Sequence, residues 1–384
     1  MNNVNLFIFF LEVTYNYGIM NIGEIMKVVI SAGGTGGHIY PALAIINKIK
    51  EEEPNSEFLY IGTHDRMEKD IVPKYNIPFE SIEIYGLSKN IIKDIKISFL
   101  FAKSIKKCKE LIKKFDPDVV IGVGGYVTAP VLYAAHKLGY KTFIHEQNSV
   151  AGKANKFIAN FVDRVGVTFP SSIDAFPKNK AIVTGNPCAS NALKTAPIDK
   201  SVYGLSKDKK LVLIVMGSQG AAIANEAILG ALSNFKDKKY EVLYVTGKNY
   251  YDKVDKNIIP LNVKVVPYID DMTRIMKSVD VIVSRAGAST LSEILALNIP
   301  SILIPSPYVP NNHQYKNAED LLKNNAAMMI EEKDLNTTTL INTIDELIND
   351  IDRQKQMKEA LKRLAITDSA SIIYDELKKL TKKG

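Results

Sequence analysis

The sequence predicts an α/β fold made of two doubly wound, Rossmann-like domains that face each other across a cleft. A short, continuous apolar run, typical of a buried parallel strand, leads into a glycine-rich turn and a helical pattern at residues 27–49 and again at residues 210–232. With 384 residues, the chain is also long enough for roughly two domains. Ligands of such sheets gather beyond the carboxyl ends of the strands, so both glycine turns are candidate binding sites.

Four segments are expected along the chain. Residues 1–25 fit poorly with the rest of the chain and are interpreted as an appendage, disordered or upstream of the true start, because Met26 directly precedes the first strand. Residues 26–187 form the first α/β domain and residues 188–366 the second, with the boundary in a stretch of small and polar residues. Residues 367–384 form a terminal helix, which we expect to cross back to the first domain.

Charge and composition limit the classes of partner. Lysine and arginine exceed aspartate and glutamate by seven, which favours anionic partners such as nucleotides or a phospholipid surface. No basic stripe with interleaved aromatic residues and no zinc-finger spacing occurs, which argues against nucleic acid. The two cysteines lie in unrelated contexts and predict neither a disulfide framework nor a metal knuckle. No stretch approaches about eighteen uninterrupted apolar residues, so we expect a cytosolic or peripheral protein.

Residues 89–114 form a basic block with nine lysines against one aspartate and one glutamate. A helix is expected at about residues 98–115, where apolar residues recur at helical spacing. Two interpretations stay open. The helix either packs on the sheet with a solvated lysine face, or it lies against anionic headgroups with apolar side chains such as Ile91 and Ile92 dipping inward.

The first glycine turn, Gly33 to His38, is the strongest local signal. Four glycines within five positions leave backbone N–H groups uncovered at a helix N-terminus, where the helix dipole favours an anion. A dinucleotide fingerprint would need glycine in place of Ile39, and a P-loop would need lysine and a hydroxyl residue after its last glycine. We therefore expect an anionic or sugar-like ligand beside His38. A simple tight turn from strand to helix is the alternative.

A polar run follows the predicted strand at residues 141–144. It comprises His145, Glu146, Gln147, Asn148 and Ser149. Polar side chains at the carboxyl end of a strand are well placed to recognise hydroxyl groups. The alternative is that Asn148 or Ser149 caps the next helix, although capping would not require the histidine and the glutamate as well.

The second domain contains the parts of a nucleotide site that needs no metal ion. Ser218 lies in its glycine turn, and a further helix N-terminus is expected at Ala288, Ser289 and Thr290. Hydroxyl and N–H groups there can hold a diphosphate, and Arg285 adds a fixed positive charge close by. No cluster of histidine, cysteine and carboxylate residues has the spacing of a metal site, and no cofactor is predicted.

Three further residues fit the recognition of a nucleotide sugar. Glu293 can accept two hydrogen bonds from a ribose diol, but together with Thr290 it also spells a capping box, and the sequence favours neither. Ile269 can flank a base by apolar contact or offer backbone hydrogen bonds, and Gln314 can reach a sugar hydroxyl. No G-x-S-x-G elbow supports a serine triad. These features favour glycosyl transfer from a nucleotide sugar.

Seven motifs follow one another along the chain: Gly33-Gly-Thr-Gly-Gly-His38, Gly124-Gly-Tyr126, His145-Glu-Gln-Asn148, Gly185-Asn-Pro187, Gly217-Ser-Gln-Gly-Ala221, Arg285-x-Gly-Ala-x-Thr-x-x-Glu293 and Gln314-Tyr-x-Asn-Ala318. In order and approximate spacing, over about residues 26–384, they resemble the MurG family of UDP-N-acetylglucosamine transferases of peptidoglycan synthesis. The resemblance implies a GT-B fold and an inverting transfer of N-acetylglucosamine to the muramyl C4 hydroxyl of lipid I, yielding lipid II. It also implies a peripheral enzyme at the cytoplasmic face of the cell membrane. The implied partners are UDP-N-acetylglucosamine, lipid I, an anionic membrane surface and other cell-wall synthesis proteins.

Residue roles follow from the resemblance by position. From the first domain, the donor sugar or diphosphate would be contacted by Thr35, Gly36, Gly37 and Asn148, with Tyr126 as a further substrate-binding candidate. From the second domain, UDP would be held by Ser218, Ile269, the segment from Ala288 to Glu293, and Gln314. One departure stands out, because many relatives carry an arginine shortly after Gly-Asn-Pro, where this chain has Cys188-Ala189-Ser190. Arg285 is our candidate for supplying the missing phosphate-facing charge.

An inverting transfer needs a general base for the acceptor hydroxyl. We expect His38 to be that base, since an unperturbed imidazole titrates near pH ~6.5 and is available at neutral pH. Glu146 is the second candidate, and His38 would then only orient its loop or contact the acceptor diphosphate. Two other functions stay open at this point: a UDP-N-acetylglucosamine epimerase of GT-B-like fold, and a non-catalytic sensor of nucleotide sugars.

Overall fold

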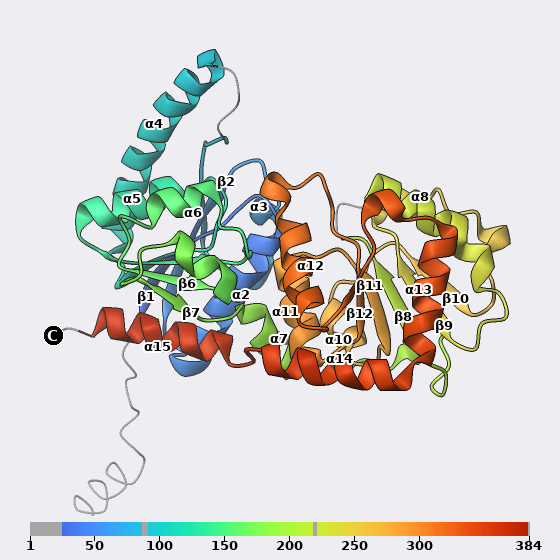
Figure 1. The fold of residues 1–384 in the computed structure, drawn as a ribbon. Coiled ribbons are helices and arrows are strands. Elements are labelled where there is room, and N and C mark those ends of the chain that lie inside the picture. Colours follow the sequence, from blue (N-terminus) through green and yellow to red (C-terminus); the bar gives the residue numbers. More distant parts are fainter. Residues whose placement is uncertain (1–24, 87–90, 218–220, 383–384) are drawn as a thin grey trace, which may run out of the picture.

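The structure, a computed structural model, describes residues 25–86, 91–217 and 221–382, and for residues 91–98 the backbone alone. The predicted appendage at residues 1–25 lies, apart from its last residue, outside these ranges. Within them the chain forms two α/β units side by side (Figure 1). Each unit is built on a parallel sheet, one of seven strands and one of six. The predicted class, with two doubly wound sheets, is confirmed.

The first sheet has the strand order β3-β2-β1-β4-β5-β6-β7. Its strands are β1 (Lys27–Ser31), β2 (Glu57–Thr63), β3 (Phe79–Ile82), β4 (Val119–Gly122), β5 (Lys141–Glu146), β6 (Arg164–Val167) and β7 (Ala181–Val183). Its helices are α2 (Gly36–Glu52), α3 (Glu68–Ile71), α4 (Ile91–Phe115), α5 (Thr128–Leu138) and α6 (Lys153–Ile158). The apolar run of β1 is buried on both sides, because Val29 belongs to one core cluster and Val28 and Ile30 to the other.

The second sheet has the order β10-β9-β8-β11-β12-β13. Its strands are β8 (Leu211–Val215), β9 (Glu241–Val245), β10 (Val263–Val266), β11 (Val281–Ser284), β12 (Ser301–Leu303) and β13 (Met328–Met329). Its helices are α8 (Ala222–Ala231), α9 (Lys248–Tyr251), α10 (Met272–Met276), α11 (Ala288–Leu297), α12 (His313–Lys323), α13 (Thr337–Asn349) and α14 (Ile351–Leu364). One apolar core joins this sheet to its helices.

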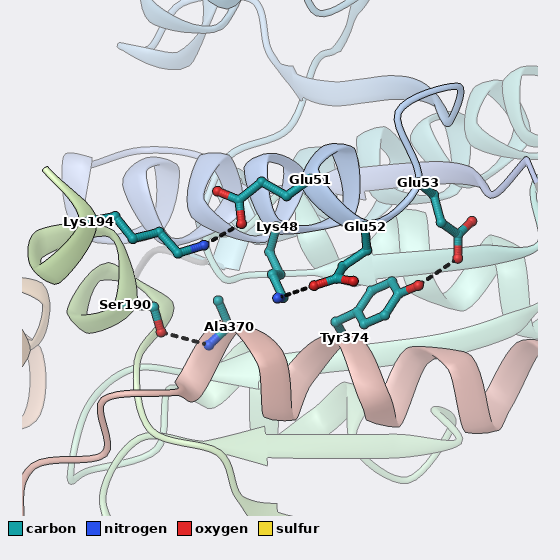
Figure 2. A network of polar contacts seen from close by, with 8 residues as sticks. All are labelled: Lys48, Glu51, Glu52, Glu53, Ser190, Lys194, Ala370 and Tyr374. Carbon is teal, nitrogen blue, oxygen red and sulfur yellow. Dashed lines mark hydrogen bonds and ion pairs between the residues drawn. The ribbon is translucent and has the colours of Figure 1, made fainter. Parts of the chain in front are cut away.

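Two helices connect the units. Helix α7 (Pro187–Lys194) packs against α2 and α11, and the terminal helix α15 (Ser369–Thr381) runs back beneath the first unit (Figure 1). Figure 2 shows the polar contacts there: the hydroxyl of Tyr374 donates to Glu53 Oε1 at 2.8 Å, and Lys194 pairs with Glu51. Ile373, on α15, is fully buried in a core of the first unit. The last helix of the chain therefore packs as part of the first unit.

Helix α4 begins before the predicted helix and projects away from the first unit (Figure 1). Its buried described side chains include Ser104, Cys108 and Ile112, four residues apart, and this stripe packs toward the unit beside α5. The described lysines between them are mostly exposed. Over the described ranges, no helix combines the length and the apolar character that crossing a membrane requires.

Candidate active site

A cleft of about 2510 Å³ lies between the two units. The first unit lines it with the loops that follow β1, β4 and β5, and the second with the loops that follow β8, β10, β11 and β12. Because these loops follow the carboxyl ends of parallel strands, the two sheets turn the same kind of edge toward one space. Ordinary small-molecule pockets measure roughly 300–1,000 Å³, so this cleft has room for two substrates.

His145 and Ser149 of the polar run do not line this cleft, whereas fourteen predicted site residues within the described ranges do. They are Thr35, Gly36, Gly37, His38, Tyr126, Glu146, Asn148, Ile269, Arg285, Ala288, Ser289, Thr290, Glu293 and Gln314. Ser218 lies outside the described residues. The structure thus brings the two predicted halves of the site together, and the contacts of each side chain distinguish their roles.

The two glycine turns of the first unit are in contact. Gly33 N donates to Gly124 O at 3.1 Å, and a Cβ on Gly125, which has φ of +89°, would meet Gly33 O at 2.5 Å. Glycine is required there by close approach as well as by backbone conformation. Helix α2 begins directly after this contact, and its N-cap Thr35 makes no side-chain capping bond.

His38 is held in one tautomer by the glycine turn. Its Nδ1 lies 3.0 Å from Gly33 O, and since a carbonyl oxygen only accepts, Nδ1 carries the proton and Nε2 is the basic nitrogen. Burial lowers the pKa of His38, against opposing effects of the Gly33 carbonyl and the Glu146 carboxylate. His38 is therefore neutral at pH 7, as a general base must be.

Glu146 holds the loop that follows β5 in place through hydrogen bonds. Its Oε1 accepts from the backbone N–H of Asn148 at 3.0 Å, and its Oε2 accepts from Gly152 N and from Asn155 Nδ2, both at 2.9 Å. The side chain is buried, and these donors engage both carboxylate oxygens. This geometry departs from the expectation that Glu146 is a candidate base and favours His38 for that role.

The capping interpretation of residues 145–149 is wrong, because the next helix, α6, begins after Gly152 and has no side-chain cap. His145 instead joins strand ends, with Nε2 donating to Gly185 O at 2.9 Å and Nδ1 facing Gln147 Nε2 at 3.1 Å. Burial lowers the pKa of His145 to about 4, which keeps this ring neutral. It is a structural histidine.

Asn317, on α12, is a residue whose role the sequence did not predict. Its Oδ1 accepts from Ser149 N at 2.9 Å and from Ser149 Oγ at 2.8 Å. Its Nδ2 donates to Ala286 O at 3.1 Å and to Asn148 Oδ1 at 3.3 Å. One fully buried amide therefore fixes the polar run of the first unit against the second unit. The available signal was its position within the Gln314-Tyr-x-Asn-Ala318 motif.

The capping-box interpretation of Thr290 and Glu293 is also wrong. Helix α11 begins after Gly287, which is its N-cap, and no side chain caps it. Thr290 is thus the third residue of the helix. Burial, and then the charge of Asp271, raises the pKa of Glu293 to about 8. A carboxyl group near the start of a helix, beside a cleft and without a hydrogen-bond donor among the described residues, is suited to accept hydrogen bonds from hydroxyl groups of a ligand.

Arg285 does not supply the phosphate-facing charge that was expected of it. Its guanidinium is buried, where it forms an ion pair with Glu332 and donates through Nη1 to Ile304 O at 3.0 Å. The charge is neutralised inside the second unit. Cys188, where many relatives have arginine, is buried as well, and burial raises the pKa of its thiol.

Two other residues retain groups for a ligand. Gln314 Oε1 accepts from Ser306 N at 2.9 Å, which leaves its Nε2 to donate. The side chain of Ile269 is 7% exposed and packs in the core of the second unit. Between the two roles considered for Ile269, this burial favours backbone hydrogen bonding over apolar contact with a base.

Comparisons with protein families agree with this geometry. The model for the glycosyltransferase family 28 N-terminal domain matches residues 28–167, and that for the family 28 C-terminal domain matches residues 211–373. The UDP-N-acetylglucosamine–N-acetylmuramyl-(pentapeptide) pyrophosphoryl-undecaprenol N-acetylglucosamine transferase 1 of Bacillus cereus is 49% identical over 364 residues, covering 93% of this chain and 100% of that protein. The transferase of Bacillus licheniformis is 46% identical over 361 residues, covering 92% and 99%.

Solved structures show the same architecture. MurG of Acinetobacter baumannii superposes with a TM-score of 0.72 at 26% identity, covering 92% of this chain and 99% of that one, which confirms the GT-B architecture. UDP-N-acetylglucosamine 2-epimerase of Neisseria meningitidis, bound to UDP-N-acetylglucosamine, gives a TM-score of 0.67 at 15% identity, covering 92% and 100%, and shows the fold alone. The chain therefore belongs to glycosyltransferase family 28 and, within it, to the MurG family of N-acetylglucosamine transferases.

Proposed function

We propose that this chain transfers N-acetylglucosamine from UDP-N-acetylglucosamine to the muramyl C4 hydroxyl of lipid I, with inversion, to give lipid II of peptidoglycan. The observation that carries the proposal is one cleft lined by a neutral, oriented histidine on one side and by a helix N-terminus with a carboxyl group on the other. Family membership supports the same donor and acceptor.

The second unit binds the donor. The first turn of α11, from Ala288 to Thr290, offers N–H groups and the positive end of the helix dipole to the diphosphate, so that no metal ion is needed. Glu293 accepts from the ribose hydroxyls, the Ile269 backbone meets the base, and Gln314 Nε2 donates to a sugar hydroxyl. Arg285 contributes indirectly, by holding the loop after β11.

The first unit binds the acceptor and supplies the base. His38 Nε2 takes the proton of the C4 hydroxyl while that oxygen bonds to the anomeric carbon and the bond from this carbon to the diphosphate oxygen breaks. UDP leaves on the opposite face, and the anomeric configuration inverts. Thr35, Gly36, Gly37, Asn148 and the exposed Tyr126 line the space around the reacting sugars.

We propose that residues 26–187 also form the membrane side of a peripheral enzyme at the cytoplasmic membrane face. The described part of α4 supports both interpretations of the basic block at once, since its buried stripe packs on the unit while its lysines stay exposed to meet anionic headgroups. Replacing Lys103, Lys106, Lys113 and Lys114 by glutamate is expected to abolish co-sedimentation with phosphatidylglycerol vesicles. The matched control makes the same change of charge on the second unit, by replacing the exposed Lys236, Lys239, Lys253 and Lys256 by glutamate. Equal binding by all variants would contradict this placement.

Release of UDP, measured with and without a lipid I analogue, tests the function. We expect release only when the acceptor is present, together with a disaccharide product. Turnover of UDP-N-acetylglucosamine without acceptor would favour the epimerase, and binding without any release would favour the sensor. Either outcome would overturn the proposal.

A further inference from the structure

Glu68, the first residue of α3, is a buried carboxylate outside the predicted site. Its Oε1 accepts from Thr63 N at 3.0 Å and from Thr63 Oγ1 at 2.6 Å, and its Oε2 accepts from Gly34 N at 3.0 Å. All three partners donate, so the group serves as an acceptor only. In the described part of the chain, no lysine or arginine forms an ion pair with it, and its side chain is 0% exposed.

The bond from Gly34 connects this carboxylate with His38. The N–H of Gly34 and the carbonyl of Gly33 belong to the same peptide unit. That carbonyl accepts from His38 Nδ1 at 3.0 Å, while the N–H donates to Glu68 Oε2 at 3.0 Å. Carboxylate, peptide and imidazole therefore form one chain of hydrogen bonds that ends at the basic nitrogen of His38, a residue that lines the cleft.

We propose that Glu68 is a positioning residue that acts on His38 through the Gly33–Gly34 peptide. Negative charge beside the N–H polarises the peptide, which makes Gly33 O a stronger acceptor, because bonds in such a chain reinforce one another. A stronger bond at Nδ1 holds the tautomer and makes Nε2 more basic. In serine hydrolases a carboxylate bonds the histidine directly, whereas here a peptide unit stands between the two groups.

The charged groups around His38 show in which direction Glu68 shifts the pKa of its ring. The carboxylates of Glu146 and Glu68 raise its pKa, and the charge of His313 across the cleft lowers it, while burial is the largest influence and lowers it. Glu146 ends β5 and accepts from donors of the loop that follows, so Glu68 is the carboxylate linked to the ring by continuous hydrogen bonds. Removing its charge must weaken the base.

The matched variants are Glu68→Gln and Thr63→Val. Glutamine keeps the shape but removes the charge and one of the two accepting oxygens. Valine at position 63 removes a hydrogen bond to Glu68 and leaves the charge and the Gly34 bond in place. The chain has five histidines, so their ring resonances can be titrated by NMR, with His38 identified from the spectrum of His38→Gln. We expect Glu68→Gln to lower the pKa of His38 by about 0.5–1 unit and Thr63→Val to leave it unchanged.

The kinetic readout rests on the proposed function, in which His38 is the base. In Glu68→Gln, the acidic limb of the kcat profile should move to lower pH by the same amount, and the plateau of kcat should fall about threefold, with UDP affinity unchanged. If Glu68→Gln does not fold, Glu68→Asp takes its place. The shorter side chain moves the carboxylate away from Gly34, and the pKa of His38 should fall by less than the amount expected for Glu68→Gln.

The two readouts separate the two claims. An unchanged pKa of His38 in a folded Glu68→Gln variant would overturn the relay, whatever His38 does in catalysis. An equal fall in Thr63→Val would also overturn it, because Glu68 would then only brace the loop. A fall in the pKa without movement of the kcat profile would uphold the relay and remove His38 as the base.

Discussion

The two halves of the cleft use carboxyl groups in opposite ways. In the first unit, Glu68 and Glu146 each accept at least three hydrogen bonds, and they brace the turn that leads to His38 and the loop that carries Asn148. In the second unit, no donor among the described residues reaches Glu293, and its pKa is raised to about 8. A carboxylate with its full set of donors is part of the framework, whereas one without them is poised for a ligand.

The largest expected effect lies in the first unit, at His38. His38→Gln removes the base and should lower kcat by about 10²- to 10⁴-fold, while UDP affinity, which belongs to the second unit, stays the same. Single-turnover kinetics and calorimetric titration with UDP measure the two quantities. A variant that retains near-normal kcat would remove His38 as the base.

The second effect concerns the ligand-facing carboxyl group of the second unit. At pH 8.5, where the carboxyl group is mostly ionised, Glu293→Gln should weaken UDP binding by about 10- to 30-fold, because the amide offers the ribose diol one accepting oxygen and no charge. The thermal midpoint should stay nearly unchanged. Calorimetric titration and a thermal melt check both statements. Undiminished UDP affinity would mean that the ribose lies elsewhere in the cleft.

Thermal stability should depend on the framework carboxyl group of the first unit and not on the ligand-facing one of the second. Glu146→Gln replaces one of the two accepting oxygens by an NH2 group, so the buried donors at that position lose their acceptor. The variant should destabilise the first unit by about 2–3 kcal/mol, seen as an earlier thermal transition. Glu293→Gln is the matched control, since it removes a carboxyl group without donors. If the two variants melted alike, the distinction between framework and ligand-facing carboxyl groups would fail.

The smallest effect is a dependence on pH. Because the pKa of Glu293 is about 8 in the free protein, the group is mostly neutral at pH 6.5 and ionised at pH 8.5. A ribose diol prefers the ionised acceptor, so uridine affinity should rise by about tenfold as pH increases across this range, and Glu293→Gln should abolish the rise. Uridine is used because a terminal phosphate titrates near pH ~6. A flat profile for the unaltered protein would contradict the assignment.

The features predicted correctly from the sequence are those that depend on residues close together in the chain. Apolar runs such as Val28-Val29-Ile30 became buried strands, and the glycine turn after them began a helix at Gly36, because these features depend on neighbours in the chain. The ordered motifs predicted the GT-B architecture. The described residues that were given a catalytic or substrate-binding role all line the cleft, since the carboxyl ends of parallel strands share one edge.

The rest depends on contacts between distant segments. The sequence predicted a free charge on Arg285, but Glu332, 47 residues later, neutralises that charge. Asn317 meets Ser149 across 168 residues, and Glu68 follows a polar turn that offers no pattern pointing to Gly34. The two predicted helix caps were wrong because α6 and α11 begin directly after Gly152 and Gly287. Neither helix uses the polar side chains nearby as a cap.

The packing of α15 has a consequence for synthesis. Ile373 and Leu377 are fully buried in the same core as Val28 and Ile30, so the unit made first is completed by a helix that follows the second unit in the chain. Domains usually fold in order as they leave the ribosome. Here part of the apolar interior of the N-terminal unit stays uncovered until the second unit and then α15 have been made.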